Sequence, residues 1–350
     1  MPERQLILGL ETSCDETSAA ILENGSKVLS NLISTQIPIH RLYGGVVPEI
    51  ASRKHLEVVN QVIAEALQEA GVTLQDLSAI AVTCGPGLVG ALLVGVSTAK
   101  ALAYALQKPL VAVNHMEGHI YANFLEHADL PFPALCLVVS GGHTDLIRIP
   151  EHGKLEILGS TRDDAAGEAF DKVARVLGLS YPGGPAVEKL ALQGNPNAYT
   201  LPLASINDHQ EWSFSGLKTT VINLNHNAEQ SGVVLNLADV AASFQQTVVK
   251  SLLANVEKEM NHQRYASFML AGGVAANQAL RKAMREIADL YQIPFSVPSM
   301  TLCTDNGAMI ASAGYYKYLR GETADLYLNA YPDLRLGEAM PVVKQNKKVL

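Results

Sequence analysis

Residues 114–119, with the sequence NHMEGH, contain side chains that can bind a metal ion. They follow an apolar run typical of a buried strand and open a pattern typical of a helix. On a helix, His115 and His119 lie on one face, roughly 5–6 Å apart at Cβ, so both imidazoles can reach one ion. The carboxylate of Glu117 would point about 200° away from His115. The zinc-protease signature has a glutamate directly after the first histidine, and here Met116 occupies that position.

A third candidate ligand, Asp305, lies far along the chain, directly before another helical pattern. Two imidazoles and one carboxylate form a metal site that leaves coordination positions open for a substrate. An aspartate at this position also commonly caps the N-terminus of a helix. Both interpretations of Asp305 remain open, as does the interpretation of the two histidines as surface or capped side chains.

Two polar turns, each between apolar strands, offer hydroxyl and backbone N–H groups to an anion, or a carboxylate to a metal. The first comprises residues 12–17 (TSCDET) and the second residues 140–144 (SGGHT). Ser13 and Thr17 bracket the first turn at the same spacing at which Ser140 and Thr144 bracket the second. His143 in the second turn is either a donor to a substrate or a structural residue. A third, glycine-rich turn at residues 271–277 leads from a strand into a helix and lets the backbone approach a ligand closely.

The elements that must position these residues occur twice along the chain. In the first half, the pattern predicts three strands within residues 5–33, a helix from Pro48 to about Ala70, and then a strand, a helix, a strand and the helix with the two histidines. The second half begins again at Pro133 with three strands, followed by helices and two short strands. The repeated order βββαβαβα predicts an α/β fold made of two duplicated lobes with facing hairpin tips.

This repeat divides the chain into three predicted segments. Residues 1–130 form a first lobe with the histidine helix, and residues 131–300 form a second lobe with the ligand-binding turns. Residues 301–350 contribute the turn with the third metal ligand and a helix that packs back onto the first lobe, followed by a polar, loosely packed tail from about residue 321. Residues 194–215 are polar and too long for a simple connector, so we expect a surface loop or lid there.

Composition limits the class of protein. Of the 350 residues, 48% are hydrophobic and 17% are charged, which excludes a disordered chain. The net charge of −8 argues against a general nucleic-acid binder, but not against a local basic surface that docks one RNA. Four separated cysteines without a C-x-x-C pair predict reduced, buried thiols. We expect a soluble, cytoplasmic chain, because residues 85–87 (GPG) interrupt the apolar run from Leu77 to Ala99 and no signal peptide is evident.

Six motifs, taken together and in this order, carry a resemblance to a known family. They occupy residues 9–17, 114–119, 139–144, 163–172, 271–277 and 303–306. Two such lobes, with phosphate-facing hairpins and a glycine-rich adenosine turn, look like the actin, sugar-kinase and Hsp70 superfamily with its nucleotide-binding cleft. Within that superfamily, the six motifs resemble the TsaD (Gcp) family.

This resemblance implies a tRNA N6-adenosine threonylcarbamoyltransferase. Such an enzyme moves the threonylcarbamoyl group from threonylcarbamoyl-adenylate to N6 of adenosine 37, in tRNAs that read codons starting with A, and releases AMP. The catalytic metal ligands it implies are His115, His119 and Asp305, with Fe²⁺ expected before Zn²⁺. The residues implied to bind the adenylate are Val138, Val139, Ser140, Gly141, Gly142, Asp171, Gly184, Glu188 and Asn277. Glu188 departs from many relatives, in which an aspartate stands, and its longer arm would still reach a ribose hydroxyl.

The expected chemistry is a direct, metal-assisted transfer without a covalent enzyme intermediate, because no Ser-His-Asp or Cys-His nucleophile is evident. The resemblance also implies partners, namely TsaB as a dimerising subunit, the ATPase TsaE and a separate synthase that supplies the adenylate. The helix around residues 52–67 is a candidate docking face for TsaB. The alternatives are a small-molecule kinase of the same superfamily, a metalloprotease, and a non-catalytic scaffold paralogue, which should lack the histidine pair.

Overall fold

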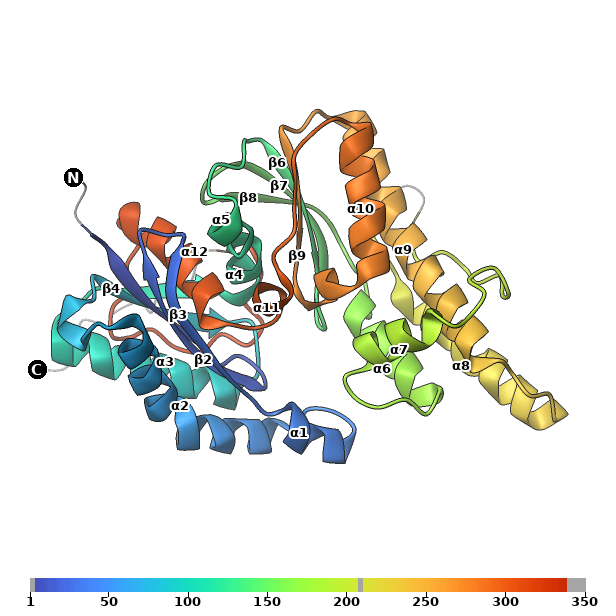
Figure 1. Cartoon of the computed structure of the whole chain (residues 1–350), viewed down its shortest axis with the longest axis horizontal. Coiled ribbons are helices and arrows are strands. Elements are labelled where there is room, and N and C mark those ends of the chain that lie inside the picture. Colours follow the sequence, from blue (N-terminus) through green and yellow to red (C-terminus); the bar gives the residue numbers. More distant parts are fainter. Residues whose placement is uncertain (1–3, 207–209, 339–350) are drawn as a thin grey trace, which may run out of the picture.

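The computed structural model of the chain describes residues 4–206 and 210–338. Two five-stranded sheets form the centres of two lobes, with helices on their faces (Figure 1). The first sheet has the strand order β3-β2-β1-β4-β5, and the second, read in the same direction, has the order β8-β7-β6-β9-β10. In both sheets, three antiparallel strands are extended by two parallel strands. The predicted duplicated α/β fold is thereby confirmed.

The predicted strands are present, and their ends differ from the expected positions by one to a few residues. The first sheet comprises β1 (Leu6–Glu11), β2 (Glu16–Glu23), β3 (Lys27–Thr35), β4 (Ala79–Gly85) and β5 (Leu110–Asn114). The second sheet comprises β6 (Ala134–Val139), β7 (Thr144–Glu151), β8 (Lys154–Ser160), β9 (Ser267–Ala271) and β10 (Phe295–Ser296). The last ladder pair of the first sheet joins Gly85 to Asn114, so β5 delivers the chain directly to the histidine motif.

The long helices also follow the sequence pattern, and the predicted helix from Pro48 to Ala70 has these bounds in the structure. The helices are α1 (Ile37–His40), α2 (Pro48–Ala70), α3 (Val89–Leu106), α4 (His115–Tyr121), α5 (Asn123–Glu126), α6 (Ala166–Val176), α7 (Gly183–Ala191), α8 (Phe214–Ser231), α9 (Leu237–His262), α10 (Gln278–Leu290), α11 (Met300–Cys303) and α12 (Gly307–Leu319). Three short 3-10 helices are η1 (Arg41–Tyr43), η2 (Leu74–Asp76) and η3 (Gly273–Ala276). The sequence did not predict α1 and α11, because four residues are too few to show a helical period.

A shared core lies between the two sheets. On β1, Leu8 faces a core beneath α2 and α3, whereas Ile7 faces a different core that contains α4 and α12. On β6, the same alternation directs Leu137 to a core beneath α6 to α10, and Cys136 to the core of α4 and α12. Burying each such aliphatic side chain contributes roughly 1.5–3 kcal/mol. The helix with the two histidines is therefore held in the middle of the molecule, between the lobes (Figure 1).

Two glycines let α12 approach its neighbours closely. A Cβ on Gly118 of α4 would lie 2.6 Å from the Cδ1 atom of Ile310 on α12. A Cβ on Gly307, at the start of α12, would lie 2.6 Å from the backbone nitrogen of Ala20 on β2. A larger residue at Gly307 would have to displace backbone, whereas a larger residue at Gly118 would have to displace the Ile310 side chain. They bring the turn that carries Asp305 next to α4.

The chain after α12 packs closely on the first lobe, so the prediction of a loosely packed tail is wrong for residues 321–338. The backbone nitrogen of Ala324 donates to the carbonyl of Leu110 on β5 at 2.8 Å. Leu328 and Leu334 bury their side chains in the core that also holds α2 and α3. Isolated leucines in a polar stretch gave no periodic signal, yet Leu328 and Leu334 each occupy an apolar site on the lobe.

The irregular chain between α7 and α8 contains the predicted surface loop of residues 194–215, of which residues 207–209 lie outside the described residues. It is anchored along α9, where Nε1 of the fully buried Trp212 donates to the carbonyl of Ser251 at 2.9 Å. The predicted boundaries of the two lobes and the C-terminal segment remain predictions, and residues 339–350 also lie outside the described part of the chain.

Among the described residues, α3 is the one helix with the length and apolar composition to cross a membrane, and 39% of it is buried. Its Gly95 lies against Thr12, with a Cβ position 2.4 Å from the threonine Oγ1, so α3 packs tightly under the first hairpin tip. Length and composition of this kind also occur in core helices. The four cysteines are free, and all but the half-buried Cys14 are buried, in agreement with the prediction of reduced thiols.

Candidate active site

The two histidines occupy the first and second turns of α4. Asn114, the last residue of β5, caps this helix, because its Oδ1 accepts hydrogen bonds from the backbone nitrogens of Met116 at 2.9 Å and Glu117 at 3.3 Å. The helix therefore begins at His115, and His119 follows one turn later on the same face. Their ring centroids lie 4.7 Å apart. The spacing on one helical face that the sequence predicts is confirmed.

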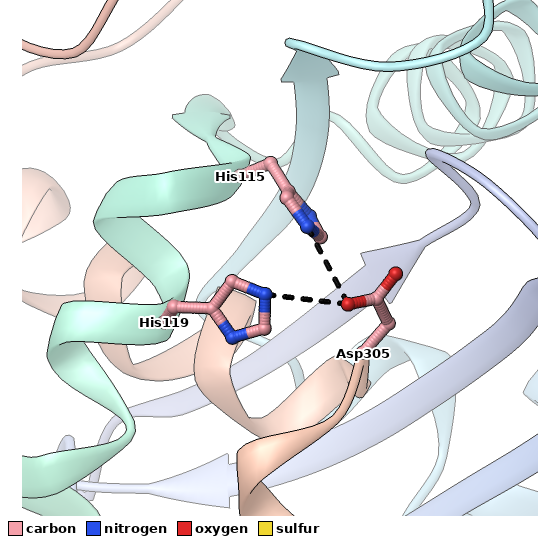
Figure 2. A group of neighbouring side chains, drawn as sticks. All are labelled: His115, His119 and Asp305. Atoms are coloured by element: carbon pink, nitrogen blue, oxygen red, sulfur yellow. Dashed lines mark ion pairs between the residues drawn. The ribbon is translucent and has the colours of Figure 1, made fainter. Parts of the chain in front are cut away.

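Asp305 faces the two histidines and does not cap the following helix. The cap of α12 is its neighbour Asn306, whose Oδ1 accepts from the backbone nitrogen of Met309 at 3.0 Å. Oδ1 of Asp305 lies 3.4 Å from Nε2 of His115 and 3.3 Å from Nε2 of His119 (Figure 2). This geometry decides between the two interpretations of Asp305 in favour of a residue of the site.

The donor set fits one metal ion. The ligand atoms of His115, His119 and Asp305 all lie within 4.8 Å of one another. Ligands about 2.0–2.1 Å from a tetrahedral ion are separated by roughly 3.3–3.4 Å, which matches the two Nε2–Oδ1 distances of 3.4 and 3.3 Å. The usual N–H···O distance is shorter, about 2.7–3.2 Å. Three convergent donors at ligand spacing form a candidate metal site.

A buried glutamate that the sequence analysis did not single out orients the first histidine. Oε2 of Glu11 lies 2.9 Å from Nδ1 of His115 and accepts from the Thr83 hydroxyl at 2.6 Å. Its Oε1 accepts from the backbone nitrogen of Ser13 at 2.5 Å. A proton on Nδ1 leaves Nε2 of His115 with a free lone pair on the side of Asp305, the arrangement usual for metal-binding histidines. The sequence signal that could have indicated a functional role for Glu11 was its carboxylate at the end of a fully buried strand.

Charge within this cluster shifts the acidity of its members. Burial alone would lower the pKa of His115, but the carboxylates of Asp305 and Glu11 raise that pKa well above its ordinary value. Burial opposes ionisation of Asp305 as well, and the two histidines nevertheless hold its pKa far below the usual range. Burial and the neighbouring His115 lower the pKa of His119. The site is thus a compact arrangement of carboxylates with imidazoles between them.

Glu117 lies on the opposite side of α4 from this cluster, as the helical spacing predicts. Its carboxylate forms an ion pair with Lys317 of α12 at 3.1 Å, and both side chains are largely buried. Glu117 therefore cannot act as a base at the histidines, and the glutamate of a metalloprotease is missing at position 116.

The second hairpin tip, between β6 and β7, is open to a ligand. Val138 and Val139 end β6, and Ser140 closes the turn by donating its backbone nitrogen to the carbonyl of His143 at 2.8 Å. Gly141 and Gly142 are exposed, and a Cβ on either would meet no atom within 4 Å. This part of the predicted adenylate-binding set forms a free rim of backbone.

The imidazole of His143 lies in the second tip. Burial lowers its pKa to about 4, and electrostatic interactions with His115 and His119 of α4 act in the same direction. Its role as a donor to the substrate stays a prediction.

The remaining predicted substrate residues are joined by hydrogen bonds within the second lobe. Asp171 on α6 accepts from the backbone nitrogen of Gly183 at 2.7 Å through Oδ1, and Glu188 on α7 accepts from that of Gln278 at 2.6 Å through Oε1. Asn277 caps α10, directly before Gln278. Gly184 lies in the first turn of α7, with no atom within 4 Å of an added Cβ. The start of α7 therefore lies beside α6, and the second half of α7 contacts the start of α10.

A cavity of about 590 Å³ lies between the lobes. From the second lobe it is lined by residues that include Gly141 and Asp171, and from the first lobe by residues that include Gly44, Gly45 and Leu88. It therefore reaches two residues of the predicted adenylate-binding set. A second cavity, of about 710 Å³, lies behind α4 and includes Glu117 among its lining residues.

The sequence matches a known family over most of its length. Residues 27–312 match the family described as TsaD, tRNA N6-adenosine threonylcarbamoyltransferase. The chain belongs to the TsaD family. A relative of that name from Clostridium perfringens is 54% identical over 337 residues, 96% of this chain and 99% of the relative. Another, from Moorella thermoacetica, is 56% identical over 331 residues, 94% of this chain and 97% of the relative.

The family membership confirms the predicted activity and substrate class: this chain is a transferase that modifies tRNA. Solved structures show the fold alone. HypF from T. kodakarensis aligns with a TM-score of 0.62 at 16% identity, over 93% of this chain and 49% of HypF. Component A of the (R)-2-hydroxyglutaryl-CoA dehydratase of Acidaminococcus fermentans aligns with a TM-score of 0.53 at 13% identity, over 90% of this chain and 99% of that chain.

Proposed function

We propose that the chain transfers the threonylcarbamoyl group of threonylcarbamoyl-adenylate to N6 of adenosine 37, in tRNAs that read codons beginning with A, and releases AMP. The family name supports the transfer to N6 of a tRNA adenosine. The observation that carries the finer proposal is the cluster of His115, His119 and Asp305, whose ligand atoms all lie within 4.8 Å of one another.

In this proposal His115, His119 and Asp305 hold one divalent ion, Fe²⁺ or, as the alternative, Zn²⁺. Two imidazoles and one carboxylate suit both metals. When bound, such an ion polarises the carbamoyl carbonyl and neutralises charge on the departing phosphate. Glu11 keeps the ring of His115 oriented, because its carboxylate engages Nδ1 and is itself held by Thr83.

The second lobe holds the adenylate. The backbone N–H groups of Gly141 and Gly142, at the open end of the predicted stretch 138–142, contact the phosphate, as glycine-rich turns do with anions. Asp171 and Glu188 use one carboxylate oxygen each for a backbone nitrogen, so the second oxygen is available to a ribose hydroxyl. Gly184 and Asn277 lie at the starts of the two neighbouring helices and border the nucleoside.

The transfer proceeds directly from the donor to the acceptor. The step forms the bond between N6 and the carbamoyl carbon, breaks the bond between that carbon and the phosphate oxygen, and releases one N6 proton to solvent. Cys14, the thiol within the first tip, is a poor nucleophile, because burial and the carboxylates of Asp15 and Asp305 raise its pKa well above the ordinary value. A covalent acyl-enzyme is therefore not part of the proposal.

TsaB, TsaE and a separate synthase that makes the adenylate complete the proposed system, in the cytoplasm. The docking face for TsaB is α2 around residues 52–67 and the neighbouring start of α3. Leu56 on α2 is 64% exposed, and Val89 on α3 is 54% exposed, so apolar surface is available to a partner. Leu56→Glu should abolish co-purification with TsaB without changing the thermal midpoint of the chain alone. Unchanged co-purification would exclude this face.

A transfer assay tests the proposed reaction. The chain, TsaB, TsaE and the synthase are incubated with ATP, threonine, bicarbonate and unmodified tRNA, and nucleoside mass spectrometry measures threonylcarbamoyladenosine. Wild type and the control His127→Ala, which removes an exposed histidine beyond α5, should form product, whereas His115→Ala should not. No product with wild type and active partners would contradict the proposed reaction. Full product with His115→Ala would contradict the catalytic role of the metal site.

A further inference from the structure

Two arginines cross from one lobe to the other beside the cavity of about 590 Å³. Arg41, on η1 of the first lobe, donates Nε to the carbonyl of Tyr181 in the second lobe at 3.2 Å. Arg175, on α6 of the second lobe, donates Nη2 to the carbonyl of Gly44 in the first lobe at 2.9 Å. Gly44, Arg175 and Tyr181 all line the cavity. The two contacts are reciprocal and fix both guanidinium groups at the mouth of the cavity between the lobes.

These two guanidinium groups form no close ion pair, although the charge of Arg175 partly counteracts the rise that burial causes in the pKa of Asp171, which lines the same cavity. Among the described residues, neither Arg41 nor Arg175 has a carboxylate oxygen within 4.0 Å, whereas Lys172 in the same cavity is paired with Asp164 at 2.9 Å and Glu168 at 2.7 Å. An arginine has five N–H donors, and each of the two arginines uses one for a carbonyl. Two such cations at one opening favour a polyanion, although the whole chain has a net charge of −8.

An exposed aromatic side chain stands beside these charges. Tyr43 is 61% exposed and Leu42 is 82% exposed, and both share the short turn η1 with Arg41. Single exposed apolar residues are common and need no explanation. Here the tyrosine is flanked by an arginine and directly precedes the glycines that line the cavity. Tyrosine and arginine next to a cavity are the groups on which proteins stack and hold unpaired RNA bases.

We propose that Arg41, Tyr43 and Arg175 form the surface that receives the loop of the acceptor tRNA. The cavity of about 590 Å³ has the size of a site for a small molecule and reaches Gly141 and Asp171 of the proposed adenylate site, so the target adenosine meets the donor at its mouth and the rest of the RNA binds at its rim. Tyr43 stacks on an unpaired base beside the target adenosine, and the two guanidinium groups contact phosphates. This inference rests on the proposed tRNA transfer and names the residues that recognise the acceptor.

Affinity for unmodified tRNA at several salt concentrations tests this surface. Base stacking on an aromatic residue contributes about 1–3 kcal/mol, so Tyr43→Ala should weaken binding about 5- to 150-fold without changing the salt dependence. Arg175→Gln removes one phosphate contact. The plot of log K against log salt concentration should therefore become less steep, by about 0.7–0.9. Tyr43→Phe should restore the affinity, because it keeps the ring.

Matched controls separate this surface from general effects of exposed rings and charges. Tyr327, 62% exposed, is the control for the aromatic ring, and Lys282, with a side chain 80% exposed on α10, is the control for the charge. Tyr327→Ala and Lys282→Gln should bind tRNA like wild type. Thermal midpoints equal to that of wild type show that the Tyr43 and Arg175 variants are folded. Binding by those two variants at wild-type affinity and salt slope would overturn the proposal.

Steady-state kinetics distinguish failure of this inference from failure of the proposed function. Tyr43→Ala should raise KM for tRNA about tenfold or more and leave KM for the adenylate unchanged. A rise in KM for the adenylate alone would overturn the acceptor surface while the reaction stands. Absence of transfer by wild type, with tRNA affinity still lowered in Tyr43→Ala, would contradict the proposed reaction and support the RNA-binding surface.

Discussion

The two hairpin tips hold equivalent positions in two sheets of the same strand order, but their surroundings differ. In the first tip, between β1 and β2, Thr12, Ser13 and Asp15 are buried. In the second tip, between β6 and β7, Gly141 and Gly142 are exposed and free of neighbours at Cβ. The same turn in a duplicated fold is closed in one lobe and open in the other.

Side-chain hydrogen bonds explain the closed tip. His55 on α2 donates Nε2–H to the carbonyl of Cys14 at 2.9 Å and accepts from the Thr17 hydroxyl at 2.8 Å through Nδ1. Glu11 holds the backbone nitrogen of Ser13. These bonds tie the first tip to α2 and to the buried Glu11, so the tip packs beside the candidate metal site.

The open tip is fixed only at its base. The Thr144 hydroxyl accepts from the backbone nitrogen of Ala166 at 3.0 Å, and the Ser140 hydroxyl accepts from that of His143 at 3.1 Å. The two glycines between them are therefore held in place while their surroundings stay open. Duplication therefore gives both lobes the same frame, and the side chains at the two tips differ, in line with the proposal that the metal binds beside the first tip and the phosphate at the second.

Removal of Asp305 should have the largest effect, because it breaks the metal cluster without touching the open tip. Asp305→Ala should lower the transfer rate more than about 100-fold and remove most bound metal, since one of three ligands is lost. Transfer kinetics and elemental analysis measure the two effects. Asp289→Ala, an exposed aspartate on α10, is the control. Retained metal with normal transfer in Asp305→Ala would remove the residue from the site.

Loss of the charge on Glu11 should weaken both the packing of the closed tip and the affinity for the metal. Glu11→Gln keeps the shape of the side chain but replaces the carboxylate at Nδ1 of His115 with an amide. A partner of this kind typically contributes about 10- to 100-fold to metal affinity, so we expect a loss of that size. A metal titration with a competing chelator measures it. Wild-type affinity in the variant would show that His115 needs no partner for its orientation.

A side chain on the open tip should weaken donor binding alone. Gly142→Val adds a stiff, branched group where no atom lies within 4 Å, so the fold accepts it while a bound phosphate loses close backbone contact. KM for the adenylate should rise about tenfold, and bound metal should stay at the wild-type amount. An unchanged KM would show that the phosphate lies elsewhere.

Acid should destabilise the chain through His143, the half-buried histidine of the open tip. The pKa of His143 is about 4 in the folded chain, mainly because of burial, against about 6.5 when unfolded. Between these values the unfolded chain binds the extra proton, so stability falls as pH falls from about 6.5 towards 4. About 1–2 kcal/mol of unfolding free energy should be lost by pH 5 through this residue. Urea unfolding at pH 7.5 and 5 should show a smaller loss for His143→Asn, and equal losses would contradict the assignment.

Periodic and motif signals in the sequence predicted the parts of the fold that obey them. The strand and helix order, the bounds of α2 and the histidine spacing on α4 follow from apolar patterns and from the proline at the helix start. The six motifs gave the family. The local sequence around Asp305 did not decide between a helix cap and a metal ligand, because Asn306 beside it is an equally good helix cap. Only the structure shows which side chain caps α12.

Other features depend on contacts that are distant in sequence. Glu11 appeared only as the end of a strand, because its partners His115 and Thr83 lie 104 and 72 positions away. The packing of Leu328 on the first lobe and the bridges of Arg41 and Arg175 between the lobes gave no local signal. Tertiary contacts of single residues, rather than repeated patterns, determine these parts of the molecule.

Metal content and AMP affinity, measured on the same two variants, test most directly whether the lobes divide the work. Asp305→Ala should lose its metal and bind AMP within about threefold of wild type. Gly141→Val should keep its metal and bind AMP about tenfold or more weakly, because bulk on the open tip displaces the phosphate. Loss of both properties in either variant, or wild-type AMP affinity in Gly141→Val, would contradict separate metal and adenylate sites on the two tips.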